Sequence, residues 1–346
     1  MPEVLPRQLV FRLSDPERRL AGVRLQQDVR LPGEQLGFTR SEDGTWELRV
    51  PRPGVDRMEY SFELQHEGGG SEWVTDPANP ARTRGAFGDK SVLEMPEYAP
   101  PVWLAAHPPR GPRRELALTS QSLAHDVPCV LWAAEGLDDA AEAPLLVVHD
   151  GPEYDALASL TLFLDAMVAD ARLPPLRAAL LAPVDRNDTY AASSAYGRAL
   201  ALGLVPRLRR EVPTGPVLGM GASLGGLAML HAQRAHPGTF AGLYLQSSSF
   251  FHRYLDGQES GFDGFARIAA FVDGVTRSTT TPEAVPVVLT CGQIEENVDN
   301  NRLMTSALQA QGYDTRLVEN RDVHTYVGWR DTFDPNLVDL VQRVLV

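Results

Sequence analysis

Lysine is nearly absent from this chain, since Lys90 is the only one among its 346 residues. Lysine and arginine together number 32, against 45 aspartates and glutamates, which gives a formal net charge of −13. This charge argues against nucleic acid or an anionic membrane as a partner, because both are bound through basic surfaces. A small anionic ligand stays compatible with it, because a local arginine cluster can reverse the field at one site.

Cysteine and long apolar runs are scarce as well. The two cysteines, Cys129 and Cys291, each fall in an apolar strand-like run. We expect them to be reduced core residues, since they form neither a disulfide framework nor a metal-binding spacing. No run is long enough to cross a bilayer, and the start of the chain lacks the pattern of a secretory signal. We therefore expect a cytoplasmic protein that needs no metal and no other cofactor.

Apolar residues are abundant, at 43% of the chain. A chain of this length can bury a large core, and its length suggests two domains. The first hundred residues read as short alternating strands, such as residues 8–13, 45–50 and 57–64, separated by glycine-rich and proline-rich turns. They predict a small all-β, immunoglobulin-like sandwich domain over residues 1–105.

A proline-rich joint near residues 100–112 leads into a different pattern. Apolar strands alternate there with helical segments, and the strands lie at residues 144–149, 178–182, 215–220, 242–245 and 287–292. This alternation is typical of a mainly parallel sheet whose two faces are covered by helices. It predicts an α/β fold of the α/β-hydrolase type over residues 113–346.

The most informative motif is Gly221-Ala222-Ser223-Leu224-Gly225, at the point where an apolar strand runs into a helix-forming segment. This is the context of the G-x-S-x-G nucleophile elbow. Glycines beside the serine let the backbone pass closely while the hydroxyl projects outward. The following helix supplies free N–H groups for an oxyanion. Ser223 is the candidate nucleophile, and the alternative is a glycine-rich turn without chemistry.

A serine nucleophile needs a base, and in this fold the histidine comes after the serine and the acid along the chain. Of the eight histidines, four precede Ser223, and His231, His236 and His252 follow it too closely to leave room for an acid. His324 remains, in a polar loop after a strand at residues 315–319. It is the candidate base, and the alternative is a solvated loop histidine.

The acid should lie at the end of the preceding strand, because catalytic groups gather outside the carboxyl ends of parallel strands. Three carboxylates follow the strand at residues 287–292. We expect Glu295 to orient the imidazole of His324 and to stabilise its protonated form. Glu296 and Asp299 are the alternatives, and either could instead be a solvated charge or a helix cap.

These features, in this order, resemble the enterochelin esterase family of esterase D type α/β-hydrolases, in which an early-set β-sandwich precedes the catalytic domain. The resemblance covers nearly the whole chain. Besides the elbow it rests on four motifs, which are Val148-His149-Asp150-Gly151, Asp185-Arg186-Asn187-Asp188-Thr189-Tyr190, Gln246-Ser247-Ser248-Ser249-Phe250-Phe251, and His324 with Trp329-Arg330.

The resemblance implies roles for several of these residues. Ser223 would be the nucleophile and His324 the base, and Arg186 would lie beside the substrate pocket. The acid stays open, because some members of the family act with a Ser-His dyad. Phe250 belongs to an aromatic group that either packs in the core or forms a wall of the pocket.

The resemblance also implies an oxyanion hole. Leu224, directly after the nucleophile, would supply one N–H group. Relatives draw the other from the residue after the Asp-Gly pair, but here that residue is Pro152, which has no N–H to donate. The second donor would then be Gly151 or Glu153.

Together these observations predict a serine esterase that acts through an acyl-enzyme on small compact aromatic esters or siderophore-type esters. One alternative is a feruloyl or acetyl esterase acting on glycans, and another is a non-catalytic glycan-binding protein with a degenerate hydrolase domain. The sequence leaves the oligomeric state undetermined.

Overall fold

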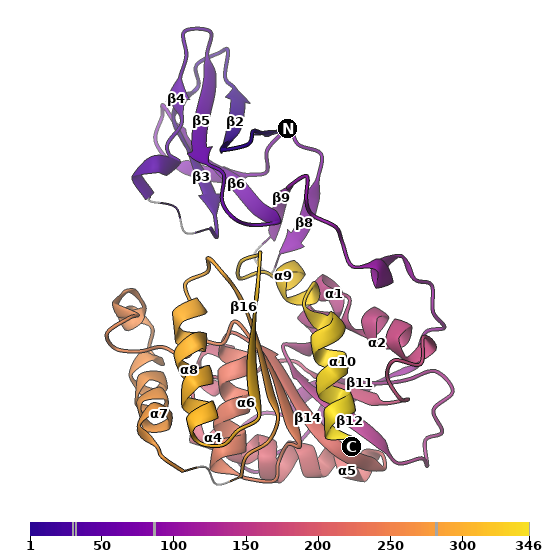
Figure 1. Ribbon diagram of the computed structural model, residues 1–346. Coiled ribbons are helices and arrows are strands. Elements are labelled where there is room, and N and C mark those ends of the chain that lie inside the picture. The colour runs from indigo at the N-terminus through magenta and orange to yellow at the C-terminus, as the bar shows by residue number, and fades with distance from the viewer. Residues whose placement is uncertain (30, 32, 86–87, 281–282, 346) are drawn as a thin grey trace. The chain divides into compact units, whose positions relative to one another are not determined.

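The computed structural model describes residues 1–29, 31, 33–85, 88–280 and 283–345 (Figure 1). The chain forms two compact units. The sandwich unit consists of Met1–Ala99, Gly292–Glu296 and Arg321–Gly328, and the α/β unit consists of Pro100–Cys291, Asn297–Asn320 and Trp329–Val346. The expected domain limits, 1–105 and 113–346, stay a prediction, because a domain is defined by independent folding.

The sandwich unit contains two β-sheets with antiparallel pairings. The first sheet has the order β1-β2-β5-β4, built from Glu3–Val4, Gln8–Ser14, Thr45–Pro51 and Thr39–Arg40. The second has the order β3-β6-β9-β8, built from Leu20–Gln27, Arg57–His66, Gly88–Glu94 and Arg82–Gly85, with β7 (Ser71–Val74) beside β6. A short 3₁₀ helix, η1 (Gly33–Leu36), follows β3.

Side chains from both sheets form the core of this unit. Leu9, Phe11 and Leu13 of β2 are buried, and the ring of Phe11 meets that of Tyr60 from β6 edge to face at 5.1 Å. Such an arrangement buries one face of each sheet against the other. The expected all-β sandwich is confirmed.

The α/β unit is built on one eight-stranded sheet of order β10-β11-β13-β12-β14-β15-β16-β17. In that order the strands are Arg113–Leu118, Val127–Ala133, Arg177–Leu181, Ala143–His149, Thr214–Ala222, Gly242–Gln246, Val287–Gly292 and Thr315–Asn320. The pairings from β13 through β16 are parallel, whereas β10, β11 and β13 pair antiparallel. The sheet is therefore mixed but mainly parallel.

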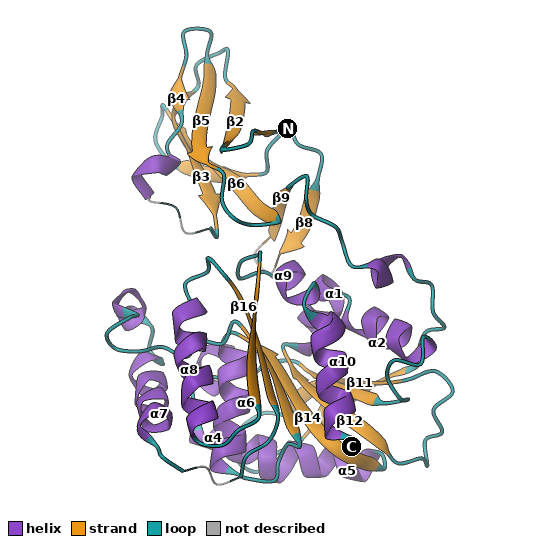
Figure 2. Cartoon of the chain, in the orientation of Figure 1, coloured by secondary structure: helices purple, strands orange, loops and turns teal. Residues whose placement is uncertain are grey.

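Helices cover both faces of this sheet, with α1, α2 and α10 on one side and α6, α7 and α8 on the other (Figures 1 and 2). The α-helices are α1 (Gly151–Ala158), α2 (Leu160–Ala169), α3 (Arg186–Thr189), α4 (Ser194–Ala199), α5 (Val205–Glu211), α6 (Leu224–Ala235), α7 (Phe265–Arg277), α8 (Val298–Ala310), α9 (Tyr326–Arg330) and α10 (Phe333–Val344). Shorter turns are η2 (Val102–Ala105), the π-helical η3 (Leu200–Leu204) and η4 (Gly257–Gly261). Every residue of β12 is buried, as expected for a strand between two helical layers. The α/β-hydrolase fold class is confirmed.

Cys129 and Cys291 are both buried, as expected of core residues. In the part of the chain that the structure describes, no helix combines the length and the apolar character of a membrane span.

Candidate functional site

Ser223 occupies the sharp turn between β14 and α6. Its backbone has φ 55° and ψ −126°, a combination that costs free energy for a residue with a side chain. Three backbone hydrogen bonds hold it there. Its N–H donates to Gln246 O at 2.9 Å, and its carbonyl accepts from Leu227 N and from Ser249 N, each at 3.2 Å. The conformation has the geometry of a nucleophile elbow.

The glycines around the elbow are required by close approach of the backbone. A Cβ atom on Gly221 would lie 2.6 Å from the carbonyl carbon of Gly225. One on Gly226 would lie 2.2 Å from Ser248 Oγ. A larger residue at either position would displace the turn that presents Ser223.

The two amides expected to form an oxyanion hole both belong to helix N-termini. Leu224 is the first residue of α6, and Gly151 is the first residue of α1. The first N–H groups of a helix have no partner within it, so they are free to bind an anion. Asp150 turns the chain into α1 with φ 50°, and a Cβ on Gly151 would lie 2.3 Å from Leu180 Cα.

His149 links the starts of these two helices. It lies fully buried at the end of β12, and its Nδ1–H donates to Gly225 O at 2.9 Å. Its Nε2 accepts from the hydroxyl of Tyr196 at 2.8 Å. Burial lowers the pKa of His149 to about 4, so the ring is neutral near pH 7 and can keep both bonds.

Arg186 forms a bidentate ion pair with Asp150. Its Nε and Nη2 lie 2.8 Å from the two carboxylate oxygens. The Asp150 carboxylate is 4% exposed and the Arg186 side chain 34%, so one partner is buried and the other reaches solvent. The sequence suggested a role for Arg186 near the substrate but did not identify this partner.

Phe250 lies in the apolar core of the α/β unit and has no exposed surface. Of the two places that the sequence left open for it, this is the core, and a role in substrate binding stays a prediction. Tyr254 of the same aromatic group is 72% exposed.

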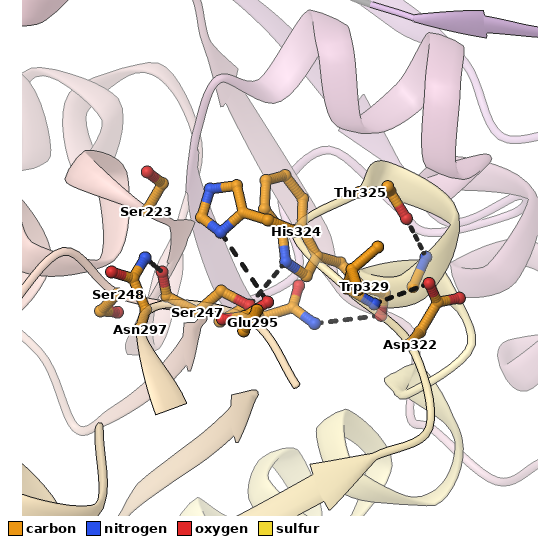
Figure 3. Close-up of polar contacts among 12 residues, drawn as sticks. Ser223, Ser247, Ser248, Glu295, Asn297, Asp322, His324, Thr325 and Trp329 are labelled. Carbon is orange, nitrogen blue, oxygen red and sulfur yellow. Dashed lines mark hydrogen bonds and ion pairs between the residues drawn. The ribbon is translucent and has the colours of Figure 1, made fainter. Parts of the chain in front are cut away.

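His324 and Glu295 lie together in the sandwich unit, with Nδ1 and Oε2 3.8 Å apart (Figure 3). Partial burial lowers the pKa of His324, but the carboxylates of Glu295, Glu296 and Asp28, with Glu295 contributing most, together hold that pKa above its ordinary value. Glu295 is 2% exposed. Of the three carboxylates considered from the sequence, it is the one paired with this imidazole.

The other two carboxylates lie in different surroundings. Glu296 is exposed. Asp299 is also exposed, and it accepts a hydrogen bond from Arg302 at 3.0 Å in the first turns of α8. Glu296 therefore lies where a solvated charge is expected, and Asp299 lies where an acidic side chain stabilises the start of a helix.

The loops that carry Glu295 and His324 are anchored to the β-sandwich. Val323 is 2% exposed within the sandwich core. Arg321 Nε donates to Asp56 Oδ1 at 2.7 Å, and its carbonyl accepts from Asp56 N at 2.6 Å. A Cβ on Gly292 would lie 2.1 Å from Asp322 O, so the backbones of the two loops touch.

One contact had no signal in the sequence. Ser249 Oγ lies 3.1 Å from Ser223 Oγ. Ser249 stands in a motif of the family resemblance, but 26 residues separate the two serines, and nothing in that spacing indicates contact. Within the described residues, no group of three or more His, Cys, Asp or Glu is placed to hold a metal ion.

No family model matches this sequence. The chain is 25% identical to the iron(III) enterobactin esterase of Escherichia coli (strain K12) over 283 residues, which are 78% of this chain and 68% of the relative. It resembles the crystal structure of the enterobactin esterase from Shigella flexneri in the presence of enterobactin, with a TM-score of 0.77 and 20% identity over 99% of this chain and 96% of that one. A ferulic acid esterase structure has a TM-score of 0.57 at 14% identity, over 68% of this chain and 99% of that one.

The comparison with the curated relative covers most of both chains, and the structural likeness covers both units of this fold. The ferulic acid esterase matches only part of the chain. In sequence the chain is thus a distant relative of an enterobactin esterase, and it shares the fold of an enterobactin esterase structure over both of its units.

Proposed function

We propose that the protein hydrolyses carboxylic esters through an acyl-enzyme formed on Ser223. The observation that carries this proposal is the backbone of Ser223, held at φ 55° between β14 and α6 by hydrogen bonds on both sides. Strain of this kind persists only where surrounding contacts maintain it, and it is frequent at reactive residues. In this fold the conformation serves to present a nucleophilic hydroxyl.

His324 acts as the base for Ser223 in this proposal, and Glu295 orients it. The support is the pairing of the two side chains and the path of the chain. β15 and β16 follow β14 in the sheet with parallel pairings, and the loop with Glu295 begins at the end of β16. The loop with His324 begins after β17, the neighbour of β16 in the same sheet.

The reaction then has two steps, formation of the acyl-enzyme and its hydrolysis. Ser223 Oγ attacks the ester carbonyl while its proton passes to His324, and the amides of Leu224 and of Gly151 or Glu153 stabilise the oxyanion. His324 returns the proton to the leaving alcohol, which leaves an acyl-enzyme. Water, deprotonated by the same histidine, releases the acid and restores Ser223.

We propose compact aromatic acyl esters as substrates, including 2,3-dihydroxybenzoyl-serine esters of the enterobactin type, and a cytoplasmic location. The named substrates of the relatives support this class. Arg186 is the residue proposed to lie beside such an anionic substrate, and its guanidinium is partly exposed. A feruloyl or acetyl ester on a glycan is the alternative substrate, which the partial likeness to a ferulic acid esterase keeps open.

The test labels the folded protein with a fluorophosphonate probe and measures turnover of nitrophenyl, dihydroxybenzoyl-serine and feruloylated oligosaccharide esters. We expect stoichiometric labelling that Ser223→Ala abolishes together with turnover, at unchanged thermal stability. Labelling that survives in Ser223→Ala overturns the nucleophile. Preferred cleavage of the feruloylated esters selects the alternative substrate.

A further inference from the structure

Ser249 presents a second hydroxyl to the proposed nucleophile. Its Oγ lies 3.1 Å from Ser223 Oγ, within the range of an O–H···O hydrogen bond. Ser249 is buried, with only 2% of its surface exposed. The proposed mechanism assigns this hydroxyl no role, although it touches the atom that would attack the substrate.

The segment that carries Ser249 is rigidly held. Ser247 has φ 44° and its N–H donates to Thr290 O at 2.7 Å, while Trp329 Nε1 donates to Ser247 Oγ at 2.9 Å (Figure 3). The carbonyl of Ser248 accepts from Asn301 Nδ2 at 2.9 Å. These bonds fix the backbone on which Ser249 stands, so its position beside Ser223 costs no ordering during the reaction.

The direction of the hydrogen bond follows from the number of protons. Each hydroxyl has one proton to donate and two lone pairs to accept. In the proposed reaction the Ser223 proton goes to His324. The bond between the serines must then run from Ser249 to Ser223, because Ser223 has no second proton to give.

We propose that Ser249 is a further catalytic residue, whose hydroxyl donates to Ser223 Oγ and strengthens this bond as the nucleophile loses its proton. The bond remains a hydrogen bond throughout, and no proton leaves Ser249. Hydrogen bonds to a group that gains negative charge are stronger than those between neutral groups. The interaction therefore favours the transition state over the resting enzyme, which is the condition for a rate effect.

The test compares Ser249→Ala with Ser248→Ala. The Ser248 hydroxyl is buried one residue away and makes no hydrogen bond among the described residues. Its removal therefore controls for the loss of a buried hydroxyl group from the same segment. Ser249→Ala keeps the N–H that bonds to the carbonyl of Ser223, so the elbow itself is retained. We expect kcat/KM and the rate of labelling by a fluorophosphonate probe to fall about 10- to 100-fold in Ser249→Ala. Both should stay near the wild-type value in Ser248→Ala.

The pH profile of probe labelling separates chemistry from misfolding. We expect Ser249→Ala to lower the plateau without moving the inflection, which belongs to His324. Ser249→Thr, which restores a hydroxyl, should recover part of the rate. Equal or faster labelling in Ser249→Ala overturns the proposal, as does a loss that Ser248→Ala reproduces.

The inference rests on the proposed function, yet the two can fail separately. Absence of labelling at Ser223 in the wild type would reject the mechanism, whereas wild-type labelling with an unaffected Ser249→Ala would reject only Ser249.

Discussion

At His324 two opposing effects act on one imidazole. Partial burial disfavours its charged form, but the carboxylates of Glu295, Glu296 and Asp28 together favour it more strongly, so the pKa lies above the ordinary value of 6.5. A base must be unprotonated before it accepts the proton of Ser223, so ester turnover should rise with pH through this raised pKa. The stability gained from the ion pair has the opposite dependence. It is present in full below the pKa of the unfolded chain and is lost as pH rises through the folded pKa.

Glu295→Gln should therefore move the inflection of kcat/KM to lower pH and reduce its plateau by about 10- to 100-fold. The loss should be smaller than that of His324→Ala, about 1000-fold or more, because 3.8 Å is too long for a strong hydrogen bond. The measurement is a pH–rate profile on a neutral nitrophenyl ester. A larger loss in Asp299→Asn or Glu296→Gln than in Glu295→Gln would show that Glu295 is not the acid.

Arg186 has two possible roles, and substrate charge separates them. If it contacts an anionic substrate, Arg186→Ala should raise KM for anionic esters about tenfold more than for neutral ones. Asp150→Asn is the matched variant, because it removes the ion-pair partner and keeps the arginine. If both variants lower kcat equally for charged and neutral esters, Arg186 acts by holding Asp150 and the adjacent Gly151, and it does not contact the substrate.

Among the secondary-structure elements, β12 and α6 are joined by His149. Its ring connects the strand end that leads into Gly151 with Gly225 in the first turn of α6. The bond to Tyr196 requires a lone pair on Nε2, which protonation would remove. The neutral ring thus helps to set the spacing between the two helix N-termini.

The lowered pKa of His149 makes this link sensitive to acid. Because the unfolded chain binds the proton at an ordinary pKa of 6.5 and the folded ring only near 4, stability should fall as pH decreases between these values. The contribution of this residue amounts to about 3 kcal/mol over that range. Urea unfolding at pH 7.5 and 4.5 should show a smaller pH-dependent loss in His149→Asn than in the wild type. Equal losses in the two proteins would contradict the assignment.

At the scale of the whole molecule, the loops that carry Glu295 and His324 belong to the sandwich unit, although the chain enters them from β16 and β17. Val323, directly before His324, is part of the sandwich core. The N-terminal segment of the chain thereby takes part in holding the histidine.

Val323→Ala should cost about 2 kcal/mol of stability and lower ester turnover about tenfold at temperatures where the protein stays folded. Val50→Ala is the matched control, since Val50 lies in the same core at 1% exposure and far from the loop along the chain. It should cost similar stability and leave turnover intact. The role of the sandwich would be refuted by equal turnover losses in both variants, or by none in Val323→Ala.

The amino-acid sequence by itself determined the fold class and the two main candidate catalytic residues, Ser223 and His324. The strand-elbow-helix around Ser223 is specified within a dozen residues, because its glycines, apolar run and helix former are neighbours in the chain. The alternation of apolar strands and helices predicts the layered sheet in the same way. His324 follows from chain order in this fold, which is also a property of the sequence.

The tertiary structure decided which groups meet. It paired His324 with Glu295 out of three carboxylates within five residues, since the path of the loop and not its composition sets which one turns inward. It joined Arg186 to Asp150 and Arg321 to Asp56, across 36 and 265 residues of chain. It enclosed Phe250 in the core and brought Ser249 to Ser223. These contacts depend on long-range packing of elements, for which spacing along one chain carries no local signal.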